Sequence, residues 1–468
     1  MTRIPLVALL AASTALSACA LSPREARGPV PAPQAWSAVT PQPGDATAAE
    51  ALGWREVFPD PRLQEVVTLA LANNRDLRVA VLNIDKARAQ YRVQRASLVP
   101  GLAATGSLSR TRTPAAVAGT GQAVEADVYG ASLGVSAFEL DLFGRVRSLT
   151  EASRQSFLAT EADWRAARVS LIAETANAYL TLAADQDLLE IARSTLETRR
   201  ATAEVVRRRF EAGAASQVDA RQAEILVEQA RGDVAQAASN VAQDRNALRL
   251  LVGADLPAEL AAADVASIAI LSDLPAGTPS SVLLARPDVL AAEHRLRGAE
   301  ANIGAARAAF LPQISLTGST GHSSADLSDL FGSGTGAWSF TPQITLPIFA
   351  GGANLAGLRS ARADRDIALA NYEKAIQTGF REVSDALAVR EMIDERLDAR
   401  ARELAAAEDS ERLARLRYER GVDDYLTLLD AQRTLYASRQ SMIALRLERA
   451  SNLASLYKAL GGGDLDAG

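Results

Sequence analysis

The feature that most constrains this chain is an internal duplication in which each half holds one pair of strand-like segments. Four positions recur at a nearly constant offset: Asp76 and Pro100 return 212 residues later as Asp288 and Pro312, and Gly213 and Gly253 return 208 residues later as Gly421 and Gly461. Each half reads as a helix, a strand hairpin, a very long helix and a second long helix, the kind of self-similarity that marks a repeated architecture. The chain therefore offers four strands, too few to close on themselves.

The first residues resemble the secretion signal of a bacterial lipoprotein. Arg3 precedes an apolar run, residues 4–16, that is too short to cross a bilayer. The segment Leu16-Ser17-Ala18-Cys19 resembles the lipobox, whose cysteine becomes the lipidated first residue of the mature protein. Ala20 after the cysteine favours the outer membrane, by resemblance to lipoprotein sorting in Gram-negative bacteria. The alternative is an ordinary signal peptide with an incidental cysteine, although Cys19 is the sole cysteine of the sequence.

Proline-rich stretches and the duplication together predict the domain organisation. Prolines crowd residues 22–44, which indicates an extended tether. The expected order is a signal peptide over 1–18, a lipid-anchored segment over 19–56, a first repeat over 57–253, an equatorial linker over 254–280, a second repeat over 281–461 and a tail over 462–468.

Alternating hydrophobicity locates the two hairpins. In the second half, over about 313–348, Trp338, Phe340 and Ile344 alternate with Ser and Thr. In the first half, over about 101–142, Tyr129 and Leu133 alternate with Gly and Ser. Such lengths and faces suit strands that cross a membrane. The alternative is a soluble two-sheet sandwich, which would need more than four strands.

Four strands leave two edges unpaired, and lipid cannot satisfy bare backbone groups. A closed barrel needs roughly eight strands or more. The strand count therefore predicts an oligomer of two or three copies, without choosing between them.

Two pairs of long helices follow the hairpins, over about 145–209 with 214–252 and about 354–419 with 423–460. A helix of about 65 residues is roughly 100 Å long, which suits a column that crosses a wide space. Gly213 and Gly421 mark the reversals, since glycine allows the left-handed residue that ends many helices. Arginines crowd both reversals. A helix C-terminus favours cations, and docking of a partner protein is the alternative explanation.

Two stretches near the C-terminus resemble the outer-membrane factors of the TolC/OprM family: Gly421-Val422-Asp423-Asp424-Tyr425-Leu426-Thr427-Leu428-Leu429-Asp430-Ala431-Gln432-Arg433-Thr434-Leu435-Tyr436 and Leu456-Tyr457-Lys458-Ala459-Leu460-Gly461-Gly462-Gly463. With the lipobox, the chain is most similar to the lipoprotein (NodT-type) branch that serves RND efflux systems.

This resemblance implies an α+β membrane protein, with four transmembrane β-strands and long antiparallel coiled-coil helices in each chain. It implies a homotrimer with one twelve-stranded β-barrel in outer-membrane lipid, continued by a twelve-helix α-barrel in the periplasm. The implied function is a passive exit duct for drugs and toxic compounds, fed by an inner-membrane RND transporter and a periplasmic adaptor that docks at the helix tips near Gly213 and Gly421.

The resemblance also implies a gate just past the second reversal. Leu426 and Asp430, four residues apart on one helix face, would form an apolar and an acidic ring under threefold symmetry. Val218, the first-half counterpart of Leu426, would complete the constriction. The alternative for Asp430 is a solvated coiled-coil residue. Four further residues are expected to tie the entrance shut: Tyr418, Asp423, Arg417 and Arg420.

Several other functions lack support in the sequence. The net charge is −6, whereas nucleic-acid binding requires a clustered basic surface. Two histidines and a lone cysteine give no catalytic constellation and no metal site, so we expect neither an enzyme nor a cofactor. The main alternative is a lipid-anchored periplasmic coiled-coil scaffold without a pore. The exported compound and the cognate pump cannot be read from the sequence.

Overall fold

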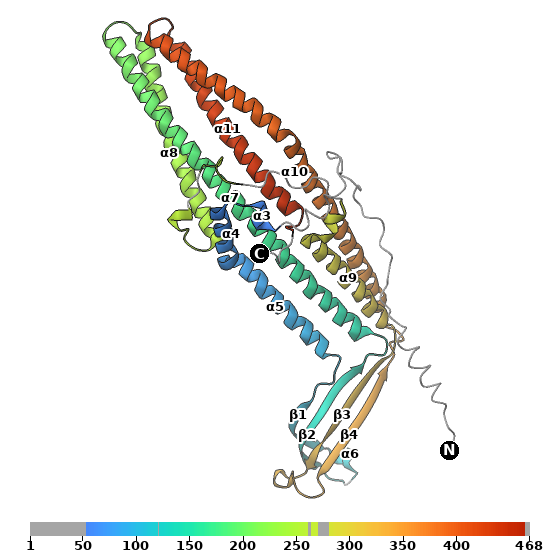
Figure 1. Cartoon of the computed structure of the whole chain (residues 1–468). Coiled ribbons are helices and arrows are strands. Elements are labelled where there is room, and N and C mark those ends of the chain that lie inside the picture. Colours follow the sequence, from blue (N-terminus) through green and yellow to red (C-terminus); the bar gives the residue numbers. More distant parts are fainter. Residues whose placement is uncertain (1–52, 120, 261–263, 270–279, 464–468) are drawn as a thin grey trace. The chain divides into compact units, whose positions relative to one another are not determined.

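The computed structural model describes residues 53–119, 121–260, 264–269 and 280–463 (Figure 1). Among these, residues 83–161 with 291–372 form one compact unit, and the remaining described residues form a second. The signal-like segment, Cys19 and the proline-rich residues 22–44 lie outside the described residues.

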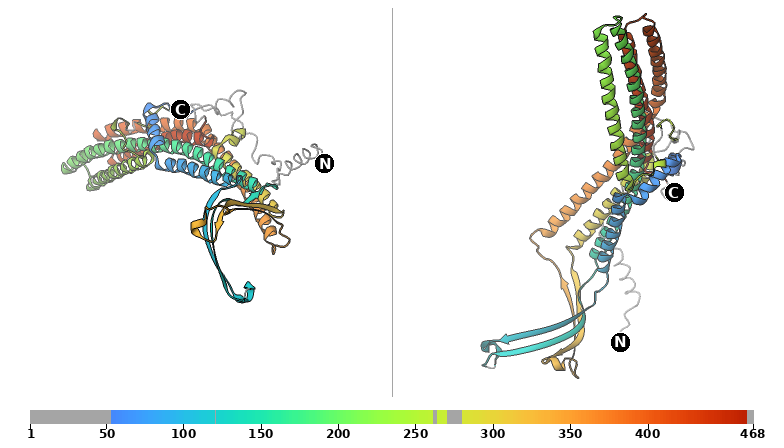
Figure 2. Two further views of the ribbon diagram at one scale, coloured as in Figure 1. Left: turned by 90° about the horizontal axis from the view of Figure 1, so that it is seen from below. Right: turned by 90° about the vertical axis from the view of Figure 1, so that its left-hand side faces the viewer.

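The first unit is built on an antiparallel sheet of four strands in the order β1-β2-β3-β4. The strands are β1 (Ala103–Thr113), β2 (Val124–Leu140), β3 (Gln313–Ser324) and β4 (Gly336–Thr345). Each repeat contributes one hairpin, and pairing of β2 with β3 joins the two hairpins into one sheet. Both views in Figure 2 show that the sheet is strongly curved.

An extra residue interrupts the regular alternation of β2. Val135 lies opposite Gly318 and Phe138 lies opposite Leu316, so β2 contains a bulge. Ala137 has a φ of 50°, and its N–H donates to the Thr317 hydroxyl at 3.0 Å instead of to a ladder carbonyl. The alternation that includes Tyr129 and Leu133 therefore holds only up to Val135.

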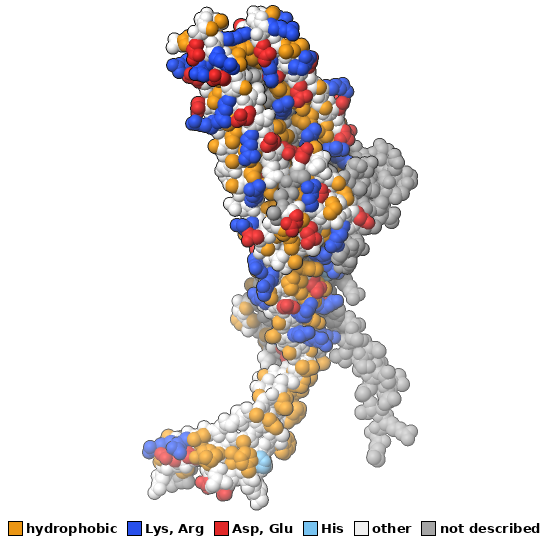
Figure 3. Space-filling model, turned by 60° about the vertical axis from the view of Figure 1, so that its left-hand side comes forward, with side chains coloured by type: hydrophobic (Ala, Val, Ile, Leu, Met, Phe, Trp, Pro, Cys, Tyr) orange, Lys and Arg blue, Asp and Glu red, His pale blue; other side chains and the backbone are white. Residues whose placement is uncertain are grey.

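Large apolar side chains lie exposed on this sheet. Trp338 is 80 % exposed and Phe340 63 %, and Leu108 and Leu133 are also exposed. On the face drawn in Figure 3, orange hydrophobic side chains extend along the strands, whereas acidic and basic side chains are interspersed over the helices. A contiguous exposed apolar surface of this kind marks contact with lipid or with another protein.

The helices account for most of the chain. Their bounds are α3 (Trp54–Val57), α4 (Pro61–Asn73), α5 (Arg75–Ala96), α6 (Ala115–Ala118), α7 (Arg145–Glu211), α8 (Gln217–Val252), α9 (Pro287–Ala308), α10 (Ala353–Glu419) and α11 (Tyr425–Ala459). The described residues also form short 3₁₀ helices: η1 (Ala258–Leu260), η2 (Ser280–Ala285) and η3 (Leu327–Asp329). In the described part of the chain, no helix is both long enough and apolar enough to cross a bilayer.

Capping residues decide where the second helix of each long pair begins. The Ser216 hydroxyl accepts the N–H of Asp219 and the Asp219 carboxylate accepts the N–H of Ser216, so α8 begins at Gln217 rather than near residue 214. Asp424 accepts the N–H of Thr427 at 3.0 Å, so α11 begins at Tyr425 rather than at 423.

The second unit has a core of small and apolar side chains along α7. Ile172, Ala176 and Tyr179 are fully buried at three- and four-residue steps, as expected for a coiled-coil seam. The short helix α3 adds Trp54 and Val57 to the buried set. The end of the segment expected over 19–56 is therefore helical and packed, because these apolar side chains gain from burial, whereas the tether expected over 22–44 lies outside the described residues.

Candidate functional site

The two long helix pairs of the second unit end in matching turns, which we call the first tip (residues 212–216) and the second tip (residues 420–424). At the first tip the N–H of Ala214 donates to Arg209 and that of Gly213 to Phe210, at 2.8 and 2.9 Å. The second tip repeats both bonds 208 residues later. This is the Schellman arrangement, which requires a left-handed residue. Gly213 has a φ of 73° and Gly421 a φ of 71°.

A hydrophobic cluster holds four helices together beneath the tips. Its buried members are Val206, Ala223, Ala414, Tyr418, Tyr425 and Leu428. Tyr418 and Tyr425 lie with ring centroids 5.8 Å apart, and the Arg209 guanidinium lies 4.5 Å from the Tyr418 ring. The Tyr418 hydroxyl is buried and has no hydrogen-bond partner among the described residues. Within one chain, Tyr418 therefore acts through the packing of its ring and makes no hydrogen bond to Asp423.

Of the residues expected to tie the entrance shut, one pair meets directly. Arg417 donates from Nε and Nη2 to the two carboxylate oxygens of Asp423 at 2.6 and 2.7 Å. These bonds lower the pKa of Asp423 below its usual value. Asp424 is occupied as the cap of α11, and bonds from the Thr427 N–H and hydroxyl lower its pKa. Arg420 has no ion pair with any described residue.

The proposed gate residues all lie on the outside of the single chain. Leu426 is 53 % exposed and Val218 64 %, each within the first two residues of its helix. Asp430 is exposed one turn after Leu426. Tyr425, Leu428 and Leu429 are buried. The helix α11 thus packs one side against the cluster and leaves the side with Leu426 and Asp430 free.

A buried cation that the sequence analysis did not predict lies between α7, α8 and α11. Arg199 is only 6 % exposed, and its Nη1 donates to the Leu226 carbonyl at 3.1 Å. Its guanidinium lies 5.4 Å from the Tyr436 ring, and its Nε has no partner among the described residues. Burial lowers the pKa of Arg199, although the charge of Asp233 opposes this shift. Ala407 occupies the matching place in the second repeat, and that asymmetry is the one signal that could have identified it.

Comparison with known proteins identifies the family. Residues 66–254 and 278–462 each match the model of the outer membrane efflux protein family, so one match falls on each repeat. The toluene efflux pump outer membrane protein TtgC of Pseudomonas putida is 47 % identical over 98 % of this chain and 95 % of its own length. The chain belongs to the outer membrane efflux protein family.

Solved structures give the same result for the fold. A crystal structure of a membrane protein from Pseudomonas aeruginosa is similar with a TM-score of 0.89 and 43 % identity, covering 95 % of this chain and 98 % of that one. The open state of the MtrE outer membrane channel of Neisseria gonorrhoeae is similar with a TM-score of 0.86 and 41 % identity, over 95 % and 98 %. The fold is that of a TolC-like outer membrane channel, with long helices, a few antiparallel strands and an internal repeat, as the sequence predicts.

Proposed function

We propose that this chain is the outer-membrane exit channel of an efflux pump and that it works as a homotrimer. The observation that carries the proposal is the open sheet, whose edge strands β1 and β4 each pair on one side only within the part of the chain that the structure describes. Exposed Trp338 and Phe340 would face lipid. Three copies would supply twelve strands for a barrel and leave no free edge.

Threefold symmetry would also turn exposed single residues into rings. Leu426 and Val218 would form an apolar constriction that resists wetting, and Asp430 would form an acidic ring that prefers cations. The exposure of these side chains in one chain supports this proposal, since an apolar side chain near a helix end gains from burial in an assembly. The Arg417–Asp423 pair would hold the second tip in its closed shape.

The partners follow from the family. An RND-type inner-membrane transporter would supply the energy, and a periplasmic adaptor would dock at the two tips, around Gly213 and Gly421. Acyl chains on Cys19 would add an anchor in the outer membrane. The chain would act as a passive conduit and not as an enzyme. A relative is named for toluene efflux, so small apolar compounds are the cargo class to test first.

Purified full-length protein in planar lipid bilayers tests the proposal. We expect a trimer by native mass spectrometry and a channel conductance that rises when the gate residues are removed. A detergent-free monomer, or a trimer that never conducts, would support the alternative of a lipid-anchored scaffold without a pore. A panel of toxic compounds on a deletion strain would then identify the cargo.

A further inference from the structure

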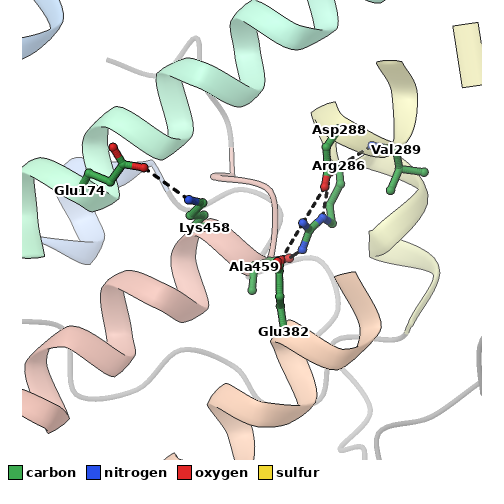
Figure 4. A network of polar contacts seen from close by, with 7 residues as sticks. All are labelled: Glu174, Arg286, Asp288, Val289, Glu382, Lys458 and Ala459. Atoms are coloured by element: carbon green, nitrogen blue, oxygen red, sulfur yellow. Dashed lines mark hydrogen bonds and ion pairs between the residues drawn. The ribbon is translucent and has the colours of Figure 1, made fainter. Parts of the chain in front are cut away.

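Arg286 lies between η2 and α9, and its guanidinium is the hub of a hydrogen-bonded network in the second unit (Figure 4). Its Nη1 donates to the Ala459 carbonyl, at the end of α11, at 2.5 Å. Its Nη2 donates to Glu382 on α10 at 2.9 Å. Its Nε and Nη2 donate to Asp288 at 3.0 and 2.8 Å. Only 6 % of the Arg286 side chain is exposed, so one buried cation joins α10, the end of α11 and the start of α9.

The same contact occurs a second time, in the first repeat. Asn74 directly precedes α5 as Arg286 directly precedes α9, and both helices have 22 residues. The Asn74 Nδ2 donates to the Leu251 carbonyl at 2.8 Å. Leu251 lies two residues before Gly253, and Ala459 lies two residues before Gly461. In each repeat, the residue before the shorter helix thus binds a carbonyl at the end of the second long helix.

The two copies of this contact differ in charge and in reach. Asn74 is neutral, and its amide nitrogen binds α8 alone. Arg286 is charged, and it reaches α10 as well through Glu382. Glu174 on α7 is the counterpart of Glu382, since α7 and α10 both have 67 residues. Glu174 does not bind Asn74 but lies 3.6 Å from the Lys458 ammonium of the other repeat (Figure 4).

The network is therefore strongest where it fixes α10 to α11. A buried guanidinium is costly unless carboxylates and carbonyls satisfy it, and here they do. Burial alone would lower the pKa of Arg286, but the bonds to Asp288 and Glu382 leave it raised. We call the region of Glu382 and Ala459 the base of the α10/α11 pair. The second tip, with Leu426 beyond it, closes the other end of the same pair.

We propose that Arg286 is a positioning residue for gating, which fixes α10 and α11 to each other at their base so that the second tip moves only when the whole pair moves. This inference rests on the proposed channel function. A pair joined at the tip and at the base behaves as one lever. A pair released at the base lets its two helices slide, and the closed position of Leu426 and Asp430 is then less well defined.

Arg286→Gln in the full-length protein tests this. We expect amide exchange near 379–385 of α10 and 453–459 of α11 to become at least about tenfold faster, and the conductance of the closed channel to rise. Glu382→Gln keeps the bonds of Arg286 to Ala459 and Asp288, so this variant should fold. It should speed exchange in α10 alone and raise the closed conductance less. Arg286→Lys, which keeps the charge, should recover part of the loss.

The first repeat supplies a matched control. Asn74→Ser keeps an oxygen that can cap α5 at the Leu77 N–H but is too short to reach the Leu251 carbonyl. It should speed exchange in the last turn of α8 and leave the closed conductance unchanged. Equal conductance in Arg286→Gln, Glu382→Gln and the unaltered protein would overturn the inference, as would an equal rise in Asn74→Ser. An unaltered protein that conducts no current would instead overturn the proposed function.

Discussion

Asp430 and Leu426 lie one turn apart on the free side of α11, so substitution can separate their roles. Asp430→Asn removes one negative charge from each chain and should weaken channel block by divalent cations several-fold. Leu426→Ala widens the apolar ring and should raise the conductance. Both effects are measured as single-channel currents in planar bilayers. Val422→Ala is the control, since Val422 is 60 % exposed in the second tip but outside the proposed rings. Equal block by divalent cations in Asp430→Asn and the unaltered protein would rule out the proposed acidic ring.

The effect of the buried Arg199 on stability can be tested with a single substitution. Its guanidinium is buried with one hydrogen bond to a carbonyl and no carboxylate within 4.0 Å among the described residues. An apolar side chain of similar volume often stabilises such a site, so Arg199→Met should raise the free energy of unfolding by about 1 to 2 kcal/mol. Arg200→Met is the matched control, because Arg200 is exposed and, among the described residues, pairs only with Glu197. The midpoint of heat-induced unfolding is the measurement. A lower midpoint for Arg199→Met would mean that the contacts with Tyr436 and Leu226 outweigh the cost of burial.

At the scale of elements, Asp187 on α7 and Asp264 in the segment between the repeats form a pair of neighbouring carboxyl groups. The Asp187 carboxylate accepts the N–H of Val265 at 3.1 Å. Burial raises the pKa of Asp187 to about 6, and Asp264 adds to the shift while Arg446 opposes it. A second pair lies between α7 and α8, where burial and Asp185 raise the pKa of Asp244 to about 6. The hollow around Asp187 is lined by Arg446 and by three further charged groups: Glu190, Glu408 and Arg439.

These shifts predict that mild acid stabilises the second unit. An unfolded aspartate has a pKa of about 3.9, so between about 4 and 6 the folded chain holds more protons than the unfolded chain. Stability then falls as the pH rises through this window. The melting midpoint should therefore increase when the pH is lowered from about 8 to about 5. The double variant Asp187→Asn with Asp244→Asn should flatten the profile. An unchanged profile in that variant would assign the pH dependence to other groups.

The sequence predicted elements well where local chemistry determines them. The alternation around Trp338 and Phe340 predicts β4, and glycine at 213 and 421 predicts the two reversals. The bulge at Ala137 was missed because it depends on the register of β2 against β3. The network of Arg286 was missed because it joins residues 96 and 173 positions apart, and one sequence contains no record of such contacts. Asn74 and Arg286 occupy equivalent places, yet their chemical difference hides the equivalence until both bonds are seen.

At the scale of the whole molecule, the duplication creates two similar repeats that are not interchangeable. Three pairs of equivalent positions differ between the first and the second repeat. They are Arg199 and Ala407, Asn74 and Arg286, and Gln222 and Asp430. The exposed Asp430 and the network of Arg286 therefore belong to the second repeat, whereas the buried Arg199 belongs to the first. In the proposed gate, the α10/α11 pair would therefore carry the acidic ring and the Arg286 network, which the α7/α8 pair lacks.

The edges of the sheet give the most direct test of assembly. The strands β1 and β4 pair on one side only within a chain, so in a closed ring β1 of one copy lies beside β4 of the next. One cysteine placed in β1 at Ser107 and a second scanned along β4 should give a disulfide between copies at the β4 position that faces residue 107 and not along the rest of β4, because a disulfide needs Cα atoms within about 7 Å of each other. Electrophoresis without reductant should show dimers and trimers and no larger species.

A control within the sheet shows what a disulfide inside one chain gives. Ser319 and Ser339 face each other across β3 and β4 with hydroxyl oxygens 2.9 Å apart. Cysteines at these two positions should cross-link within the chain and leave a monomer band. A ladder that continues beyond three copies would mean that the edges join without closing. A monomer band for every cysteine position tried in β4 would mean that β1 of one copy does not lie beside β4 of the next. The proposed ring of three chains would then be wrong.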